Sequence, residues 1–198
     1  MERIGILGGT FDPPHIGHLI LAQHALDAIG LNQLLFVPAA DPPHKQQEDK
    51  APVEDRLAML DCAIMDNPQF AISRVDVDRP GPHYSVDMVR LLQADYPQAE
   101  LFFVMGGDSL RDLPKWHQPQ ELIRLCKIAV MRRPQSTISP DMHHDTLPEL
   151  ADRLTIVDAP LIDISSTAIV ARCAAGKSIR YLVPDAVLAY IKDHQLYR

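Results

Sequence analysis

Two histidines near the N-terminus have the type and spacing to hold an anion. A short apolar run is followed by GGTFDPPHIGH, residues 8–18, which leads into a helical pattern. Because residues three apart project on the same side of a helix, His15 and His18 would point the same way. Glycines let a backbone approach a phosphate, and the N–H groups of a helix start attract negative charge. The pattern predicts an anion clamp, with Gly17 leaving room for the ligand; the alternative is a tight turn with two surface histidines.

Two better-known phosphate motifs do not fit this sequence. A dinucleotide-binding turn would carry GxGxxG after the first strand, and residues 8–10 do not have that spacing. The segment Gly176-Lys177-Ser178 resembles the end of a P-loop, but Ala171 stands where the first glycine should be. This segment also closes a helical pattern, so we interpret Gly176 as the residue that follows a helix end.

The elements that would position the histidines form a regular alternation. Apolar runs of strand length lie at residues 4–7, 34–37, 70–75, 101–105, 128–131 and 154–157. Helical patterns lie at residues 16–29, 53–65, 84–94 and 120–126, and two more follow in succession at 165–175 and 184–194. Several strands are continuously apolar, which is typical of strands covered on both faces. The sequence therefore predicts an α/β fold: one domain, residues 1–198, with a parallel sheet, helices on both faces and a C-terminal helical extension. Residues 8–18 would lie at the carboxyl end of the first strand, where such sheets bind ligands.

Composition narrows the classes of partner. Lys and Arg number 19 against 26 Asp and Glu, a formal net charge of −7, so we expect neither nucleic acid nor a membrane as partner. An anionic ligand would need a local cluster of donors. The three cysteines, at positions 62, 126 and 173, form no CxxC pair and indicate a reducing cytoplasm. The glycine-rich start does not fit a signal peptide, and no apolar run reaches membrane-spanning length.

A family resemblance becomes visible at this point. GGTFDPPHIGH resembles the signature of the nucleotidylyltransferase superfamily, whose members share HxGH. Other segments occur in the order seen in bacterial nicotinate-mononucleotide adenylyltransferases: VP and PPHK within 37–45, GGDS at 106–109, WH at 116–117, RRP at 132–134, ISST at 164–167 and SIRYLVP at 178–184. The resemblance implies a Rossmann-like enzyme of NAD biosynthesis that transfers the adenylyl group of ATP to nicotinate mononucleotide and releases pyrophosphate. It also implies Mg²⁺ bound with ATP, through substrate oxygens and water.

The resemblance implies roles for the residues that match its motifs. Catalysis would rest on His15 and His18, with no metal ligand in the protein. The implied ATP-binding residues are Gly8, Gly9, Thr10, Phe11, Gly106, Asp108, Ser165, Ser166 and Thr167. The implied mononucleotide-binding residues are His44, Lys45, Ser85, Trp116 and Arg133, with Trp116 stacked on the pyridine ring. Each has a structural alternative, which is a helix cap for the hydroxyls, a turn for Asp108, core packing for Trp116 and surface charge for Lys45 and Arg133.

Some positions depart from the family pattern. Val170 stands where the family commonly has arginine, and Ser85 where it often has threonine. Arg172 would lie about 200° around the helix from Val170, so it is a poor substitute by geometry. We therefore expect Val170 to weaken the binding of the triphosphate and to leave the type of reaction unchanged.

Alternatives to this function stay open from the sequence. One is another transferase of the superfamily, acting on phosphopantetheine or a phosphoalcohol, and another is a nucleotide-sensing module without turnover, supported only by Val170. A third is a zinc site built from His143, His144 and Asp145, within an irregular segment at 134–148. The sequence does not decide whether the chain forms a homo-oligomer.

Overall fold

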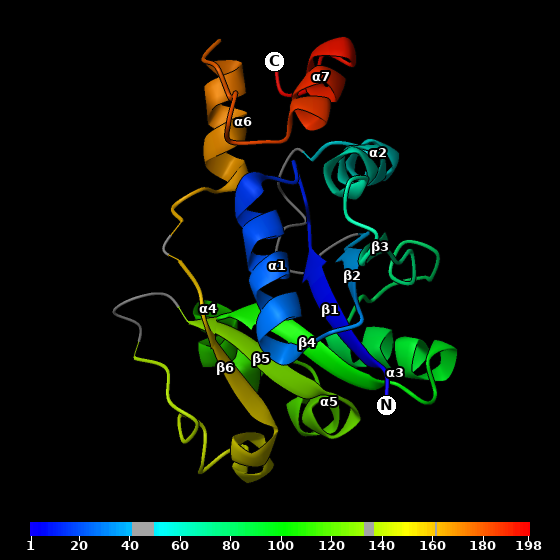
Figure 1. Ribbon diagram of the computed structural model, residues 1–198, viewed down its shortest axis with the longest axis vertical. Coiled ribbons are helices and arrows are strands. Elements are labelled where there is room, and N and C mark those ends of the chain that lie inside the picture. Colours follow the sequence, from blue (N-terminus) through cyan, green and yellow to red (C-terminus); the bar gives the residue numbers. More distant parts are fainter. Residues whose placement is uncertain (41–49, 133–136, 161) are drawn as a thin grey trace.

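One parallel sheet organises the protein (Figure 1). The computed structural model describes residues 1–40, 50–132, 137–160 and 162–198. Within these ranges the strands follow the order β3-β2-β1-β4-β5-β6, and every neighbouring pair is parallel. Their bounds are β1 Arg3–Gly9, β2 Gln33–Pro38, β3 Phe70–Ile72, β4 Glu100–Gly106, β5 Lys127–Arg132 and β6 Leu154–Asp158. The strand order reverses direction between β1 and β4, which places a ligand crevice at the carboxyl ends of these two strands.

The helices lie close to the positions that periodicity predicts. Their bounds are α1 Ile16–Ile29, α2 Val53–Ile64, α3 Ser85–Asp95, α4 Gly107–Asp112, α5 Pro119–Leu125, α6 Ser166–Ala174 and α7 Asp185–Asp193, with short 3₁₀ segments at Leu113–Lys115 and Pro148–Arg153. Helix α4 and both 3₁₀ segments were not expected, because elements of three to six residues are too short to show a helical period. The third strand was expected to reach residue 75, but it ends at Ile72. A turn follows, in which the N–H groups of Val77 and Asp78 donate to the Arg74 carbonyl.

Alternate residues of the strands bury themselves in two separate core layers. Helices α1 and α2 cover one face of the sheet, whose core includes Leu26 and Phe36. Helices α3 and α5 cover the other face, where Val89 and Phe103 are buried (Figure 1). This arrangement confirms the α/β fold with helices on both faces.

The C-terminal helices form the predicted extension and bury a third core of their own. Helices α6 and α7 pack with α2 around Met59, Ile169 and Val187, at the end of the molecule that lies at the top of Figure 1. Gly176 follows the end of α6 and has a φ of +65°, a left-handed backbone conformation that glycine adopts easily, as expected for the residue after a helix end. Pro184 precedes α7 directly, one position earlier than the first helical position expected for it.

The segment expected to be irregular is irregular where it is described. Residues 137–147 contain turns and neither helix nor strand, yet Ile138 and Leu147 are buried in the core. No helix in the ranges described is long and apolar enough to cross a membrane.

Candidate active site

His15 and His18 meet at the start of α1. His15 is the residue before the helix and has an extended backbone, and His18 lies in the first turn. Their rings stack, with centroids 3.7 Å apart and planes inclined by 21°. The His15 backbone N–H donates to His18 Nδ1 over 3.2 Å. Because Nδ1 accepts this bond, the proton of a neutral His18 ring resides on Nε2, which is then a hydrogen-bond donor.

Burial decides the charge of both imidazoles. Removal from water lowers the pKa of His15 to about 4. Burial, together with the neighbouring His15, lowers the pKa of His18 to about 3. At neutral pH both rings are therefore uncharged. Their contribution to an anion site is that of N–H donors.

Gly17 makes room for a protein side chain. A Cβ at this position would lie 3.0 Å from His15 Nδ1 and 3.1 Å from His15 Cε1. The expectation that Gly17 leaves space for the ligand is therefore corrected: its missing side chain allows the His15 ring to turn back over the helix start. Within the described residues, His15 Nδ1 is buried without a hydrogen-bond partner.

The glycines of the two central strands serve different purposes. A Cβ on Gly9 would lie 2.9–3.2 Å from the Phe11 ring, so Gly9 accommodates that ring. Phe11 is 1% exposed and meets His18 edge-on, with centroids 5.0 Å apart, so its ring packs against His18, and Phe11 is not among the residues that line the cavity. By contrast, a Cβ on Gly8 would come no closer than 4.0 Å to its nearest neighbour, and one on Gly106 would meet nothing within 4 Å.

The start of α6 is tied to the loop that carries the histidines. The Ser165 hydroxyl accepts from Ala168 N at 3.2 Å and so caps the helix. The Ser166 hydroxyl donates to the Pro13 carbonyl at 2.9 Å, and Thr167 is exposed. The structure thus brings residues 165–167 and the HxGH segment together, and of the three hydroxyls only that of Ser165 has the helix-cap role that was the alternative.

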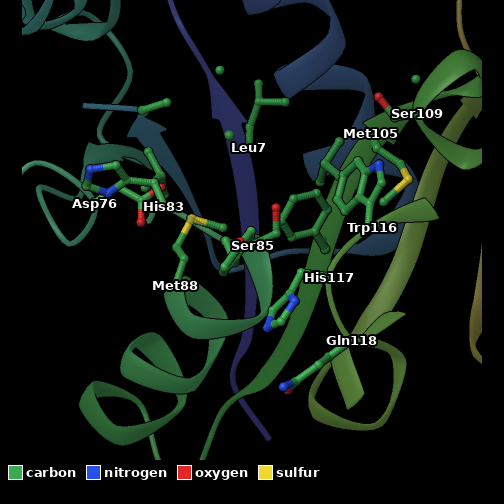
Figure 2. A pocket seen from close by; sticks show the side chains of 18 of the residues that line it. Leu7, Asp76, His83, Ser85, Met88, Met105, Ser109, Trp116, His117 and Gln118 are labelled. Atoms are coloured by element: carbon green, nitrogen blue, oxygen red, sulfur yellow. The ribbon is translucent and has the colours of Figure 1, made fainter. Parts of the chain in front are cut away.

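A cavity of about 660 Å³ opens at the carboxyl ends of β1 and β4 (Figure 2). Of the residues singled out from the sequence, Gly8, Gly9, Ser85, Gly106 and Trp116 line it. The Trp116 ring packs edge-on against Phe103, with centroids 5.8 Å apart and an interplanar angle of 78°. This contact fixes the orientation of the indole in the cavity wall, and Figure 2 shows Trp116 on the other side of the cavity from Ser85.

Sequence reasoning missed several residues of the cavity wall. They are Asp76, His83, Tyr84, Met88, Ser109, Lys115, His117 and Gln118. The Tyr84 and His117 rings stack with centroids 4.0 Å apart, which joins the segment before α3 to the segment after Trp116. These segments follow the carboxyl ends of β3 and β4, where parallel sheets bind ligands. Their position after predicted strands could therefore have identified them as part of the cavity wall.

A buried ion pair supports one side of this wall. Arg79 donates to Asp76 Oδ1 through Nε at 2.8 Å and lies 2.7 Å from it through Nη2. The same guanidinium donates to the carbonyls of Pro82 and Tyr84 at 3.0 and 3.2 Å. Burial raises the pKa of Asp76, and the Arg79 contacts oppose that effect. The cavity wall therefore contains a carboxylate, already engaged by an arginine.

Asp108, a predicted ATP-binding residue, does not line the cavity. The Asp108 side chain is 87% exposed and pairs with Arg111 at 2.8 Å. Arg172 donates through Nε and Nη2 to the Ser178 carbonyl at 3.0 and 2.7 Å, so it is engaged near the end of α6. His44, Lys45 and Arg133 lie outside the described residues.

The zinc alternative finds no support in the described ranges. The His143 ring lies 2.7 Å from the Leu110 carbonyl through Nε2, a contact that ties its segment to α4. The described residues contain no group of three or more His, Cys, Asp or Glu able to hold a metal ion.

Comparison with known proteins relates the site to a family. Residues 6–172 match the cytidylyltransferase-like family model. A relative from Thermomicrobium roseum, named "Probable nicotinate-nucleotide adenylyltransferase", is 48% identical and covers 100% of this chain and 92% of its own length. A relative of the same name from Synechococcus sp. is 45% identical, covering 99% of this chain and 95% of its own length.

A solved structure shares the fold. Nicotinic acid mononucleotide adenylyltransferase of Plasmodium falciparum, complexed with NaAD, superimposes with a TM-score of 0.80 at 16% identity, over 100% of this chain and 98% of that one. That identity supports the fold alone, whereas the matches at 48% and 45% identity extend over nearly all of both sequences. On those matches, the chain belongs to the nicotinate-nucleotide adenylyltransferase family.

Proposed function

We propose that this protein transfers the adenylyl group of ATP to nicotinate mononucleotide, giving nicotinate adenine dinucleotide and pyrophosphate in NAD biosynthesis. The observation that carries the proposal is the stacked His15–His18 pair at a helix start, joined to the cavity by Gly8 and Gly9. The names of the relatives at 48% and 45% identity support the same reaction. Three free cysteines in the described chain suit a reducing compartment, so we place the reaction in the cytoplasm.

The chemistry requires little proton transfer. The second pKa of a phosphate monoester is about 6, so the mononucleotide phosphate is mostly a dianion at neutral pH and needs no general base. One of its oxygens forms a bond to the α-phosphorus of ATP while the bond from that phosphorus to the bridging oxygen breaks and pyrophosphate leaves. The protein must align two polyanions and stabilise the charge that develops on the leaving group. The Nε2–H of His18 is a donor suited to this charge.

The donors at the helix start suit phosphate better than a bare metal ion. They are imidazoles and hydroxyls, and the carboxylate of Asp12 is already engaged by the Tyr197 hydroxyl and the Ala51 N–H. We therefore assign Mg²⁺ to the ATP phosphates and water. Bound there, Mg²⁺ would screen the triphosphate charge.

The cavity would receive the nicotinate mononucleotide, with the pyridine ring against Trp116. We expect the acid to be preferred over the amide, because an amide NH₂ would need an acceptor. The wall carboxylate that sequence reasoning missed, Asp76, already accepts from Arg79. An unpaired buried polar group costs about 1–3 kcal/mol, which corresponds to about tenfold to hundredfold discrimination.

One assay separates this function from its alternatives. Purified protein is incubated with ATP and, in turn, nicotinate mononucleotide, nicotinamide mononucleotide or 4′-phosphopantetheine, and pyrophosphate release is measured. We expect turnover with nicotinate mononucleotide and a lower kcat/KM with the amide. Turnover with phosphopantetheine alone would indicate the related transferase. ATP binding in calorimetry without turnover of any acceptor would indicate a sensing module.

A further inference from the structure

A buried arginine joins the histidine loop to the cavity wall. Arg56 of α2 is 2% exposed, although it carries a guanidinium. Its nitrogens donate to four backbone carbonyls, those of Thr10 at 2.8 Å, Ala39 at 2.9 Å, Ala40 at 3.2 Å and Ala51 at 3.2 Å. Thr10 precedes the HxGH segment, and Ala39 lines the cavity. One side chain therefore fixes the relative position of the histidine loop and the wall that faces the second substrate.

Asp12 and Tyr197 complete the same cluster. Asp12 Oδ2 accepts from the Ala51 N–H at 3.2 Å, and Asp12 Oδ1 accepts from the Tyr197 hydroxyl. The negative charge of Asp12 also compensates the buried charge of Arg56. Burial and the bond to Asp12 raise the pKa of Tyr197, so the phenol keeps its proton and remains a donor.

None of these three side chains lines the cavity, but all act on the backbone that leads to His15. Asp12 is three residues before His15, and its carboxylate is held from two sides. Rotation or displacement of this carboxylate would carry the loop with it, and with the loop the Nε2–H of His18. Misplacement of a catalytic group by about 1 Å can lower a rate about a hundredfold.

We propose that Arg56, Asp12 and Tyr197 are positioning residues that hold the His15–His18 pair in register with the cavity, so that Tyr197 helps to set the rate of adenylyl transfer. The proposal rests on the function proposed above. It predicts that loss of the Tyr197 hydroxyl lowers kcat more than it raises the KM values, because alignment of the His18 Nε2–H with the reacting phosphate matters most in the transition state.

The chain offers a matched control in Tyr190. Its hydroxyl donates to Asp55 Oδ1 at 2.8 Å, so it also joins the C-terminal region to a carboxylate. Asp55 belongs to α2, however, and its bond to Tyr190 does not involve the histidine loop. Tyr190→Phe and Tyr197→Phe each remove one phenol hydroxyl that donates to an aspartate, so they make the same chemical change at two places.

The kinetic test compares the two variants with the wild-type protein, after thermal unfolding has shown that each is folded. For Tyr197→Phe we expect kcat to fall about tenfold, with the KM values for ATP and nicotinate mononucleotide within about twofold of wild type. For Tyr190→Phe both parameters should stay within about twofold. A wild-type kcat in Tyr197→Phe, or an equal loss in both variants, would overturn the proposal.

Hydrogen exchange gives a readout that does not depend on turnover. The amides of Thr10, Phe11, Asp12, His15 and Ala51 should exchange faster in Tyr197→Phe than in wild type, and Tyr190→Phe should leave them unchanged. If the wild-type protein showed no adenylyl transfer, the proposed function would fail while this comparison still tested the positioning. Unchanged exchange in Tyr197→Phe would overturn the positioning role, as would faster exchange with a wild-type kcat.

Discussion

His18 combines a buried neutral ring with a fixed tautomer, and this combination predicts how its loss would act. We expect His18→Ala to lower kcat, because the activation free energy should rise by about 2.7–4 kcal/mol, as for removal of one preorganised oxyanion donor. The KM for ATP should change far less. Steady-state pyrophosphate release measures both parameters. His24→Ala is the control, because His24 is an exposed imidazole of the same helix. A near-normal kcat in folded His18→Ala would exclude this role.

Gly17 gives a prediction in which stability and activity move in opposite directions. Alanine is a better helix former than glycine by about 0.5–1 kcal/mol, so Gly17→Ala should not destabilise α1. Its Cβ, however, would lie 3.0 Å from His15 Nδ1 and displace that ring. We expect a thermal midpoint equal to or above wild type and a kcat lowered about tenfold or more. A variant with unchanged kcat would show that the His15 ring can shift without consequence.

At the scale of elements, the start of helix α6 is the segment we propose for the ATP phosphates, and position 170 carries valine where the sequence resemblance implies arginine. Arg172 is engaged by the Ser178 carbonyl, so it does not replace that charge. Val170→Arg should lower the KM for ATP about tenfold, the effect of a hydrogen bond to a charged group, and leave the KM for nicotinate mononucleotide unchanged.

The neighbouring position supplies the control for this helix. Ala171→Arg adds the same charge about 100° around α6, on an exposed face, and should leave the KM for ATP near wild type. If Val170→Arg had no effect on ATP either, another cation such as Lys177 or Arg180 would already provide the contact.

At the scale of the whole molecule, the two buried imidazoles link stability to pH. Their pKa values, about 4 and 3, lie below the ordinary value of 6.5, so between pH 6.5 and 4 the unfolded chain binds protons that the folded chain does not. The contribution of the two neutral imidazoles to the free energy of unfolding should therefore be complete above pH 6.5 and should be lost progressively as the pH drops toward 4. Each histidine can contribute up to about 1.4 kcal/mol per pH unit.

Urea unfolding at pH 7.5, 6 and 5 measures this dependence. A His15→Gln/His18→Gln double variant removes both groups and should show a shallower fall in the free energy of unfolding than wild type. A His24→Gln/His144→Gln variant, which changes two exposed histidines, should keep the wild-type slope. Equal slopes in wild type and the His15/His18 variant would mean that other groups control the acid limb.

Much of this fold could be predicted from the sequence because its information is local. The continuous apolar strands and the helical period of residues 16–29 depend on neighbours within a turn or two, and α1 has the predicted bounds. His15 and His18 do lie on the same side as predicted, but His15 precedes the helix, and the contact between its backbone N–H and His18 Nδ1 sets the arrangement. Where a local signal was short the prediction failed, as for α4 with its six residues and for the turn that ends β3.

The tertiary structure decided the properties that depend on contacts distant in sequence. Burial made the imidazoles neutral, and the neighbouring His15 ring occupies the space that a side chain at position 17 would need. The wall residue Asp76 and its partner Arg79 lie in and after a turn that follows β3 and that no periodic pattern marks. Tyr197 meets Asp12 across 185 positions, a contact that neither residue's neighbours encode. Periodicity determines which side of an element is buried, whereas pKa values and long-range hydrogen bonds depend on which surfaces the folded chain brings together.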